Sequence, residues 1–375
     1  RSTLFPYTTL FRSNQRLSEN PDAIIVDTES TDAGPHKLGA NVAIVSRRAY
    51  KKDLSRLIHA GFASKIPVII GSAGGSGAKA HVDWTLSILD EILEELRHPR
   101  VKIAAISADI PKNLVTKKLA EGKVIPLSRT VPTLTKAAIA ETTGIVAQMG
   151  HEPILEALEN GADIVICGRS YDPAPFAAAA IRAGFDPGLA YHMGKILECG
   201  ALCADPGTAK DCILGEIKQN CFEVHSLNPK LRCTKTSVAA HTFYEKAHPY
   251  LLPGPGELLD LERCEFSEIR PGVIRVSGSR LHPVSPYRIK LEGARRIAYR
   301  TFTIAGVRDP LLVGEIEKVE TLVRDSILAQ YADLDPEAYQ VNFYNYGKNA
   351  VMGEAEPNES LVRSEERRVG KECRS

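Results

Sequence analysis

The feature that most limits the fold of this chain is an alternation, up to about residue 205, of short β-branched runs with longer amphipathic stretches. The pattern predicts strands at 23–27, 68–71, 101–107, 124–127, 144–148 and 163–168. It predicts helices at 48–64, 81–97, 112–121, 133–141, 151–160 and 174–183. Such alternation is typical of parallel sheets covered on both faces. We therefore expect an α/β fold with an open, mostly parallel, doubly wound sheet, because the units are too few for an eight-stranded barrel.

The pattern changes after Pro206. Three short strands separated by Gly/Pro turns are predicted at 272–278, 287–293 and 296–306, which favours antiparallel pairing. A long helix is predicted at 310–331 and a further strand at 339–346. The sequence thus predicts an α/β domain at 14–206, followed by a smaller α+β domain at 207–362 whose C-terminus we expect to be truncated.

The two ends of the chain resemble one piece of DNA translated from both strands. Leu10-Phe11-Arg12-Ser13 can be encoded by CTC TTC CGA TCT, whose reverse complement encodes Arg363-Ser364-Glu365-Glu366. We interpret 1–13 and 363–375 as adapter-derived sequence and expect both segments to be loosely attached, because they were not selected to pack. Residues 14–362 are expected to be a fragment, with a strand missing upstream of Asn14.

Composition excludes several classes of partner. Without the two end segments the chain holds 40 basic and 43 acidic residues, a formal charge of −3 in place of +1. No basic surplus indicates nucleic acid or an anionic membrane as partner. The apolar runs are far shorter than the roughly 20 residues of a membrane span. Seven of the eight cysteines lie outside the end segments, and this odd, scattered set favours reduced thiols. We expect a cytoplasmic protein with a small-molecule substrate. Whether it forms a homo-oligomer or binds a small companion subunit is left open.

Polar residues follow five of the predicted strands, where ligands bind in open α/β sheets. These residues are Asp27, Glu29 and Asp32; Gly71 to Gly77; Ser107 and Asp109; Gln148 and His151; Arg169 and Asp172. We expect one cleft to be lined by Asp27, Gly74, Gly75, Asp109, Gln148, Arg169 and Asp172. The alternative is that these are ordinary loop and N-cap residues.

The glycine run Gly71-Ser72-Ala73-Gly74-Gly75-Ser76-Gly77 is the clearest candidate ligand loop. Its backbone amides could approach a phosphate, a carboxylate or a thioester oxygen, so Gly71, Gly74, Gly75 and Gly77 are candidate substrate-binding residues. The run matches neither GxxxxGK[ST] nor GxGxxG, which disfavours ATP and NAD as cofactors. A tight packing turn is the alternative.

Arg169 and Asp172 lie where a buried strand breaks into a turn. Arg169 could form a forked pair with a substrate carboxylate, and Asp172 could act as a base or orient the arginine. An internal Arg–Asp pair that closes the turn is the alternative.

His241 and Glu245 are four residues apart and share a face if the segment is helical. They could bind a divalent metal if the loop from Asp27 to Asp32 supplied a third ligand, or His241 could act as a base that Glu245 orients. A pair that merely supports the helix is the alternative. No other cofactor is indicated.

Six segments of the chain form a distinctive set: VDTESTDAGP, GSAGGSG, GADIVICGRSYDPAPF, ILECGALCADPG, CTKTSVAAHTFYE and KLEGARRIAYRTFTIAGVRDP. Together they resemble the acyclic terpene utilisation family of bacterial proteins, the AtuA-like group once labelled only as a domain of unknown function, and the resemblance spans residues 14–331. It implies catabolism of isoprenoid or related branched compounds, such as citronellol and geraniol, through CoA thioesters. It supplies no mechanism.

Two functions of different classes follow. The first is a lyase, hydratase or hydrolase acting on a carboxylated or CoA-linked branched substrate. Its acid/base candidates are Asp27, Asp32 and Asp172, with Arg169 and the glycine loop holding anionic groups. The second is a non-catalytic binding or assembly subunit for an acyl-CoA-processing enzyme, which the absence of a complete catalytic motif leaves open.

Overall fold

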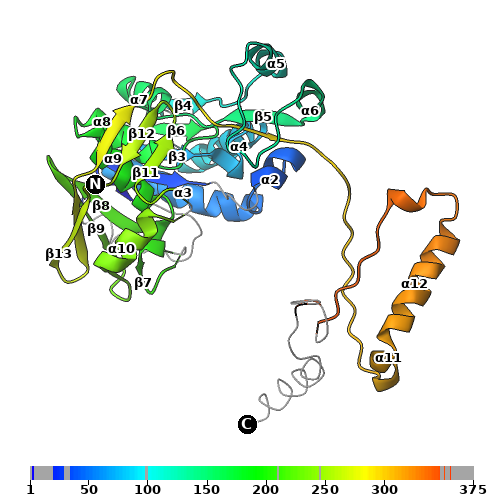
Figure 1. Cartoon of the computed structure of the whole chain (residues 1–375). Coiled ribbons are helices and arrows are strands. Elements are labelled where there is room, and N and C mark those ends of the chain that lie inside the picture. Colours follow the sequence, from blue (N-terminus) through cyan, green and yellow to red (C-terminus); the bar gives the residue numbers. More distant parts are fainter. Residues whose placement is uncertain are drawn as a thin grey trace, which may run out of the picture. The chain divides into compact units, whose positions relative to one another are not determined.

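The computed structural model describes residues 2–3, 20–28, 34–97, 100–208, 211–244, 246–346, 350 and 355. The chain divides into two compact units, Arg1–Ile297 and Ala298–Ser375, which are treated separately as unit 1 and unit 2. Unit 1 contains a central sheet with helices on both faces (Figure 1). Every candidate site residue that the structure describes belongs to unit 1.

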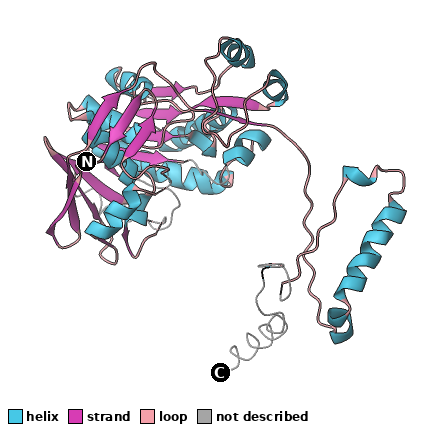
Figure 2. Ribbon diagram, in the orientation of Figure 1, coloured by secondary structure: helices cyan, strands magenta, loops and turns pink. Residues whose placement is uncertain are grey.

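Within the described residues, nine strands form the central sheet, in the order β13-β14-β9-β8-β1-β2-β3-β6-β4. The parallel strands are β2 (Ala23–Asp27), β3 (Val68–Gly71), β6 (Ile164–Cys167) and β4 (Ile103–Ile106). The antiparallel strands are β8 (Ile213–Ile217), β9 (Cys221–Ser226), β14 (Val273–Ser277) and β13 (Glu265–Arg270). The predicted sequence of parallel strands followed by antiparallel strands is confirmed, and Figure 2 shows these strands in magenta.

Helices cover both faces of the parallel strands, because successive side chains of a buried strand point to opposite faces. Ile24 and Val26 belong to one hydrophobic cluster, together with residues of α3 (Arg47–Ser64) and α4 (Lys79–Leu96). Ile25 belongs to the cluster on the other face, with residues of α7 (Glu152–Glu159), α8 (Ala174–Arg182) and α9 (Pro187–Leu197). This arrangement confirms the doubly wound sheet.

Side-chain caps explain where several helices begin. Ser46 accepts a hydrogen bond from the Ala49 amide at the start of α3, and Asp186 accepts one from the Leu189 amide at the start of α9. Helix α10 (Lys235–Thr242) begins with a capping box formed by Thr234 and Ser237. Each cap satisfies an amide that the helix itself leaves without a partner.

The other described elements of unit 1 are short and connect or edge the main layers. They are α2 (Gly34–Ala40), η2 (Ala73–Gly75), α5 (Lys112–Ala120), α6 (Lys136–Glu141), η3 (Gly200–Cys203), β7 (Ala204–Asp205), β10 (Arg232–Cys233), β11 (Leu251–Gly254), β12 (Glu257–Asp260) and β15 (Arg280–Pro283). Strands β11, β12 and β15 form a separate three-stranded sheet.

Strand β5 (Gly144–Ala147) differs from the prediction in its pairing. It pairs antiparallel with β16 (Leu291–Ala294) in a two-stranded sheet and does not join the parallel strands. The segments predicted as strands at 124–127, 296–306 and 339–346 form no strand in the described residues. A strand exists only through hydrogen bonds to a neighbour, and a local sequence pattern does not specify that neighbour.

The first end segment contributes one short strand, β1 (Ser2–Thr3), which lies between β2 and β8. At these two residues the expectation of loose attachment is not met; 4–13 and 363–375 lie outside the described residues. Backbone pairing needs no particular side chains, so a segment not selected to pack can still fill a strand position. The predicted domain boundary at Pro206 falls between strands of the same central sheet.

Unit 2 contains α11 (Pro310–Gly314), α12 (Ile316–Gln330) and η4 (Pro336–Ala338). The single helix predicted over 310–331 is interrupted at Glu315. The Arg324 guanidinium lies 4.8 Å from the Phe343 ring centroid, and Asn345 Nδ2 donates to Glu320 Oε1. None of its described residues is buried, so the described part of unit 2 forms no hydrophobic core.

Candidate functional site

Arg169 is the centre of a polar network at the carboxyl edge of the parallel strands. Its side chain is only 3% exposed. Nε and Nη2 donate to the two carboxylate oxygens of Glu292 at 3.0 and 3.2 Å, and Nη1 donates to Asp172 Oδ1 at 3.0 Å. Nη1 also donates to Ser72 Oγ at 3.2 Å and to the Ser170 carbonyl. In this structure the guanidinium nitrogens that were expected to bind a substrate carboxylate bind the carboxylate of Glu292.

Glu292 belongs to this network, although it was not among the residues predicted from the sequence. It lies on β16, far along the chain from Arg169, and is also bound by Gln148 Nε2 at 3.2 Å and Lys290 at 3.0 Å. Burial opposes ionisation, but the charges of Arg169 and Lys290 outweigh it and lower the pKa of Glu292. Glu292 lies in the segment KLEG, which begins one of the six motifs that resemble the family. Only the pairing of β5 with β16 brings it to Arg169.

The glycine loop, Gly71 to Gly77, packs closely against other parts of unit 1. An added Cβ would lie 2.7 Å from His81 Cβ at Gly74, 2.8 Å from Ile44 Cβ at Gly75 and 2.1 Å from the Arg169 amide nitrogen at Gly77. The amides of Gly75 and Gly77 donate to carbonyls within the loop. These contacts support the alternative of a packing turn, whereas ligand binding by the loop stays a prediction.

Asp27, Asp109 and Gln148 lie at the same edge but contact different partners. Asp27 ends β2, and its Oδ1 would be 3.3 Å from a Cβ on Gly71. Asp109 Oδ2 accepts a hydrogen bond from the Lys79 amide at 2.6 Å, at the N-terminus of α4. Gln148 joins Arg169 and Asp172 through Glu292. Hydrogen bonds thus join Gln148, Arg169 and Asp172, three of the seven residues predicted to line one cleft, and that cleft stays a prediction. None of the seven, all of them within the described residues, lines the hollow discussed below, whose lining includes Ser107.

His241 is buried at the end of α10, and its ring stacks on Tyr244 with a centroid separation of 5.5 Å. Burial, assisted by the charge of Lys195, lowers the pKa of His241 to about 4, so the ring is neutral near pH 7. Its predicted partner Glu245 and the acid/base candidate Asp32 lie outside the described residues. Within the residues that the structure does describe, no three His, Cys, Asp or Glu side chains are grouped to hold a metal ion.

A second group of buried ionisable residues lies behind Asp172 and was not predicted. Lys195 of α9 and Glu198, the residue that follows this helix, form an ion pair, with side chains only 2% and 3% exposed. Burial raises the pKa of Glu198 to about 7, although Lys195 acts in the opposite direction. A Lys–Glu pair three residues apart is common on helix surfaces, so the local sequence gave no signal that this pair is buried.

Tyr191 and Glu257 form a third buried pair, close to the end of β5. The Tyr191 hydroxyl lies 2.9 Å from His151 Nδ1 and close enough to the Glu257 carboxyl of β12 to influence its pKa, while Glu257 Oε1 has no hydrogen-bond partner in the described residues. Both Tyr191 and Glu257 are buried, at 1% and 6% exposure. Burial raises the pKa of Glu257 to about 8, and the interaction with Tyr191 only partly offsets this.

Glu257 is expected to make folding stability depend on pH. Its pKa of about 8 in the folded protein lies above its ordinary value of 4.5. The stability that the protonated Glu257 carboxyl gives to the folded state is therefore fully present below pH 4.5 and is lost as pH rises from 4.5 to about 8. The free energy of unfolding of the wild type, relative to Glu257→Gln, should fall by up to about 1.4 kcal/mol per pH unit there. Urea denaturation at several pH values checks this, with exposed Glu262→Gln as the control. A difference between wild type and Glu257→Gln that does not vary with pH would contradict it.

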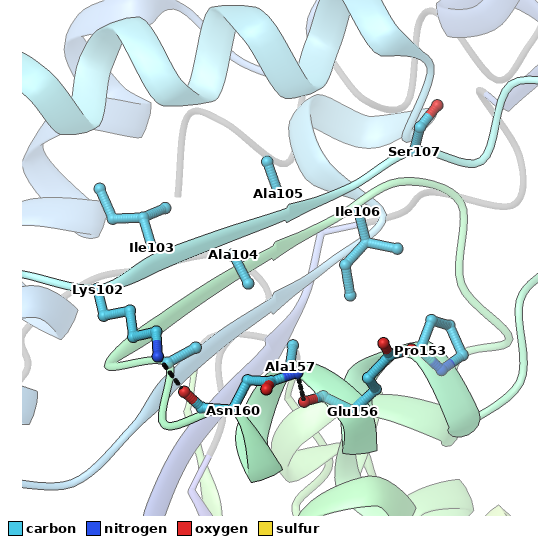
Figure 3. A pocket seen from close by; sticks show the side chains of 11 residues that line it. Lys102, Ile103, Ala104, Ala105, Ile106, Ser107, Pro153, Glu156, Ala157 and Asn160 are labelled. Carbon is cyan, nitrogen blue, oxygen red and sulfur yellow. Dashed lines mark hydrogen bonds between the residues drawn. The ribbon is translucent and has the colours of Figure 1, made fainter.

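An open hollow of about 390 Å³ lies along strand β4 and beside α7. Figure 3 shows Ile103, Ala104 and Ile106 of the strand, with Glu156 and Ala157 of the helix, among its lining side chains. This hollow is therefore distinct from the network around Arg169. The described helices include none that is both long enough and apolar enough to cross a membrane.

The comparisons with known proteins agree with the resemblance seen in the sequence motifs. The model of the acyclic terpene utilisation family protein AtuA matches residues 15–369, which include the glycine loop, Arg169 and Glu292. The match begins after the first adapter-like segment and extends into the second. Comparisons with curated proteins and with solved structures gave no match. Since the family model covers most of its length, the chain belongs to the acyclic terpene utilisation (AtuA) family.

Proposed function

We propose that this chain is a catabolic enzyme of the lyase, hydratase or hydrolase type acting on a carboxylated or CoA-linked branched isoprenoid. The observation that carries the proposal is the network in which loops after β3 and β6 meet β16 around buried Arg169. Ionisable groups that gather at one edge of an α/β sheet are more typical of a catalytic site than of a plain packing surface. The family membership favours isoprenoid catabolism, and the compound class follows from the resemblance.

Asp172 is the acid/base candidate that the geometry favours most. Its side chain is 22% exposed, whereas Arg169 beside it is buried. One carboxylate oxygen receives a hydrogen bond from Arg169, which fixes the orientation of the group. A carboxylate held in this way can take or return a proton at a bound substrate. Asp27 is a second acid/base candidate at the same edge. The proposed substrate is a small molecule and not a nucleic acid.

The proposal is tested by incubating a branched isoprenoid acid, and separately its CoA thioester, in a cell extract with and without the purified protein. We expect wild type to convert one of them, and mass spectrometry separates addition of water, cleavage and release of free CoA. Asp172→Asn should lower the rate by about 100-fold or more, while exposed Glu262→Gln should match wild type. Equal conversion with and without wild type would overturn the proposal.

A non-catalytic assembly subunit is the second candidate, and two observations favour it. The described donors of Arg169 are already taken up by protein acceptors, which suits a residue that holds loops together. Unit 2 has no described buried residue, although α12 carries apolar side chains such as Leu322 and Val323. Co-purification with an acyl-CoA-processing enzyme, without any conversion of substrate, is the outcome that would support this function.

A further inference from the structure

His151 lies at the same sheet edge as Asp172, although neither proposed function uses it. The Met149 amide donates to the Arg169 carbonyl at 3.1 Å, and the Tyr171 amide donates to the Met149 carbonyl at 2.9 Å. The segments that follow β5 and β6 therefore run side by side. This pairing places His151, the residue before α7, next to the loop that carries Asp172.

The two nitrogens of the His151 ring have different surroundings. Nδ1 lies 2.9 Å from the buried Tyr191 hydroxyl, and the two rings meet edge to face at 81°. Nε2 makes no hydrogen bond in the described part of the chain and is not among its enclosed polar atoms. The side chain is 20% exposed. Nδ1 is thus positioned by a buried hydroxyl, and Nε2 is open to a reacting molecule.

Tyr191 connects His151 to a buried carboxyl. Its hydroxyl lies 2.9 Å from His151 Nδ1 and close enough to Glu257 to influence the pKa of that carboxyl, whose buried Oε1 has no hydrogen-bond partner in the described residues; the Tyr191 ring stacks on Tyr171 at 6.1 Å. A hydroxyl both donates and accepts, so it can pass a proton between two neighbours without becoming charged. This arrangement is expected of a reacting imidazole whose orientation is set by two further groups, here Tyr191 and then Glu257.

We propose that His151 is a catalytic acid/base of the enzyme, reacting through Nε2, and that Tyr191 and Glu257 are positioning residues that set its tautomer. The proposal rests on the proposed function, since it needs a substrate at this edge. It extends that function to proton transfer at a carbon or oxygen next to a carboxyl or thioester carbonyl.

The proton transfer balances over the three groups. With Glu257 protonated and its hydroxyl turned toward Tyr191, that hydroxyl donates to Tyr191, Tyr191 donates to His151 Nδ1, and Nε2 carries the single N–H proton of the neutral ring. When Nε2 gives this proton to a substrate, Nδ1 takes the Tyr191 proton and Tyr191 takes the Glu257 proton. The result is an ionised Glu257 and a neutral ring with a free Nε2 lone pair. One proton has left Nε2, one has left Glu257, and the reverse sequence makes Nε2 a base.

The surroundings keep the ring neutral during this exchange. Burial lowers the pKa of His151, while Glu152, whose carboxylate lies 3.9 Å from Nδ1, acts in the opposite direction. The titratable groups that face the relay are Glu152 of α7, Tyr191 of α9, Glu257 of β12, Tyr171 of the β6 loop and Tyr287 before β16. Among these, only Tyr191 approaches Nδ1 at hydrogen-bond distance in the described residues.

The relay is tested by nitrogen NMR of the whole chain labelled with 15N-histidine, with the His151 signals identified by their loss in His151→Gln. We expect the ring proton of wild type to move from Nε2 to Nδ1 as pH rises from 6 to 10, without the ring becoming charged. Glu257→Gln and Tyr191→Phe should abolish the movement, whereas Glu152→Gln, the matched control, should keep it. A tautomer that does not change with pH in wild type, or that changes alike in all variants, overturns the relay.

The catalytic role is tested separately with the isoprenoid acid and thioester assay described above. We expect His151→Gln to lower turnover by about 100-fold or more, with the folded state confirmed by unchanged circular dichroism. If wild type turns over substrate and His151→Gln does so equally, the role of His151 is overturned while the proposed function stands. Absence of turnover by wild type overturns the proposed function and the catalytic role together, and the NMR result then decides only the relay.

Discussion

Arg169→Ala is expected to lower the free energy of unfolding by about 3–5 kcal/mol, the range measured when one partner of a buried ion pair is removed. The guanidinium binds Glu292 through two hydrogen bonds and also binds Asp172 and Ser72. Without it, Asp172 loses the guanidinium beside it and Glu292 keeps, within the described residues, only Lys290 as a counter-charge, with both carboxylates mostly buried. Chemical denaturation at neutral pH measures the loss.

Two further variants show whether this loss arises from the buried charges. Arg47→Ala removes an arginine whose ion pair with Glu91 is 42% exposed on both sides, so it should cost less than about 1 kcal/mol. Adding Glu292→Gln to Arg169→Ala should recover part of the loss, because it removes a mostly buried carboxylate that has lost its bidentate partner and is left with Lys290. If Arg169→Ala costs no more than Arg47→Ala, the network does not stabilise unit 1 as inferred.

Gly77→Ala is expected to lower the free energy of unfolding by about 3 kcal/mol. Its backbone has φ of +63°, and an added Cβ would lie 2.1 Å from the Arg169 amide nitrogen and 2.5 Å from the Gly168 carbonyl carbon. The left-handed conformation costs a residue with a side chain about 1–2 kcal/mol, and forcing backbone atoms apart in a packed region costs about 1–3 kcal/mol more.

Gly122→Ala is the matched control for this prediction. Gly122 has a similar φ of +66°, but no atom lies within 4 Å of the added Cβ. Both variants therefore carry the conformational cost, and only Gly77→Ala carries the clash. Equal losses in denaturation experiments would show that the loop moves away from Arg169 easily, and the close packing assigned to the glycine loop would then be wrong.

The sequence alone determined the class of fold and the family. Hydrophobic runs such as 23–27 and 68–71 became buried strands with the predicted bounds, because burial on both faces of a parallel sheet requires a continuous apolar segment. The helices at 48–64 and 174–183 were predicted to within one residue at each end, since amphipathic periodicity and caps are local properties. The six motifs were enough to indicate the AtuA family, which the family model confirms.

The tertiary structure alone decided which side chains meet. Glu292 reaches Arg169 because β16 pairs with β5, and Glu257 reaches Tyr191 because β12 lies against α9. These partners are separated by many residues, and no local pattern encodes the register of a distant strand. Burial is likewise a property of the assembled layers. Lys195 and Glu198 have the spacing of a surface ion pair, yet α9 is enclosed on every side, and this enclosure raises the pKa of Glu198.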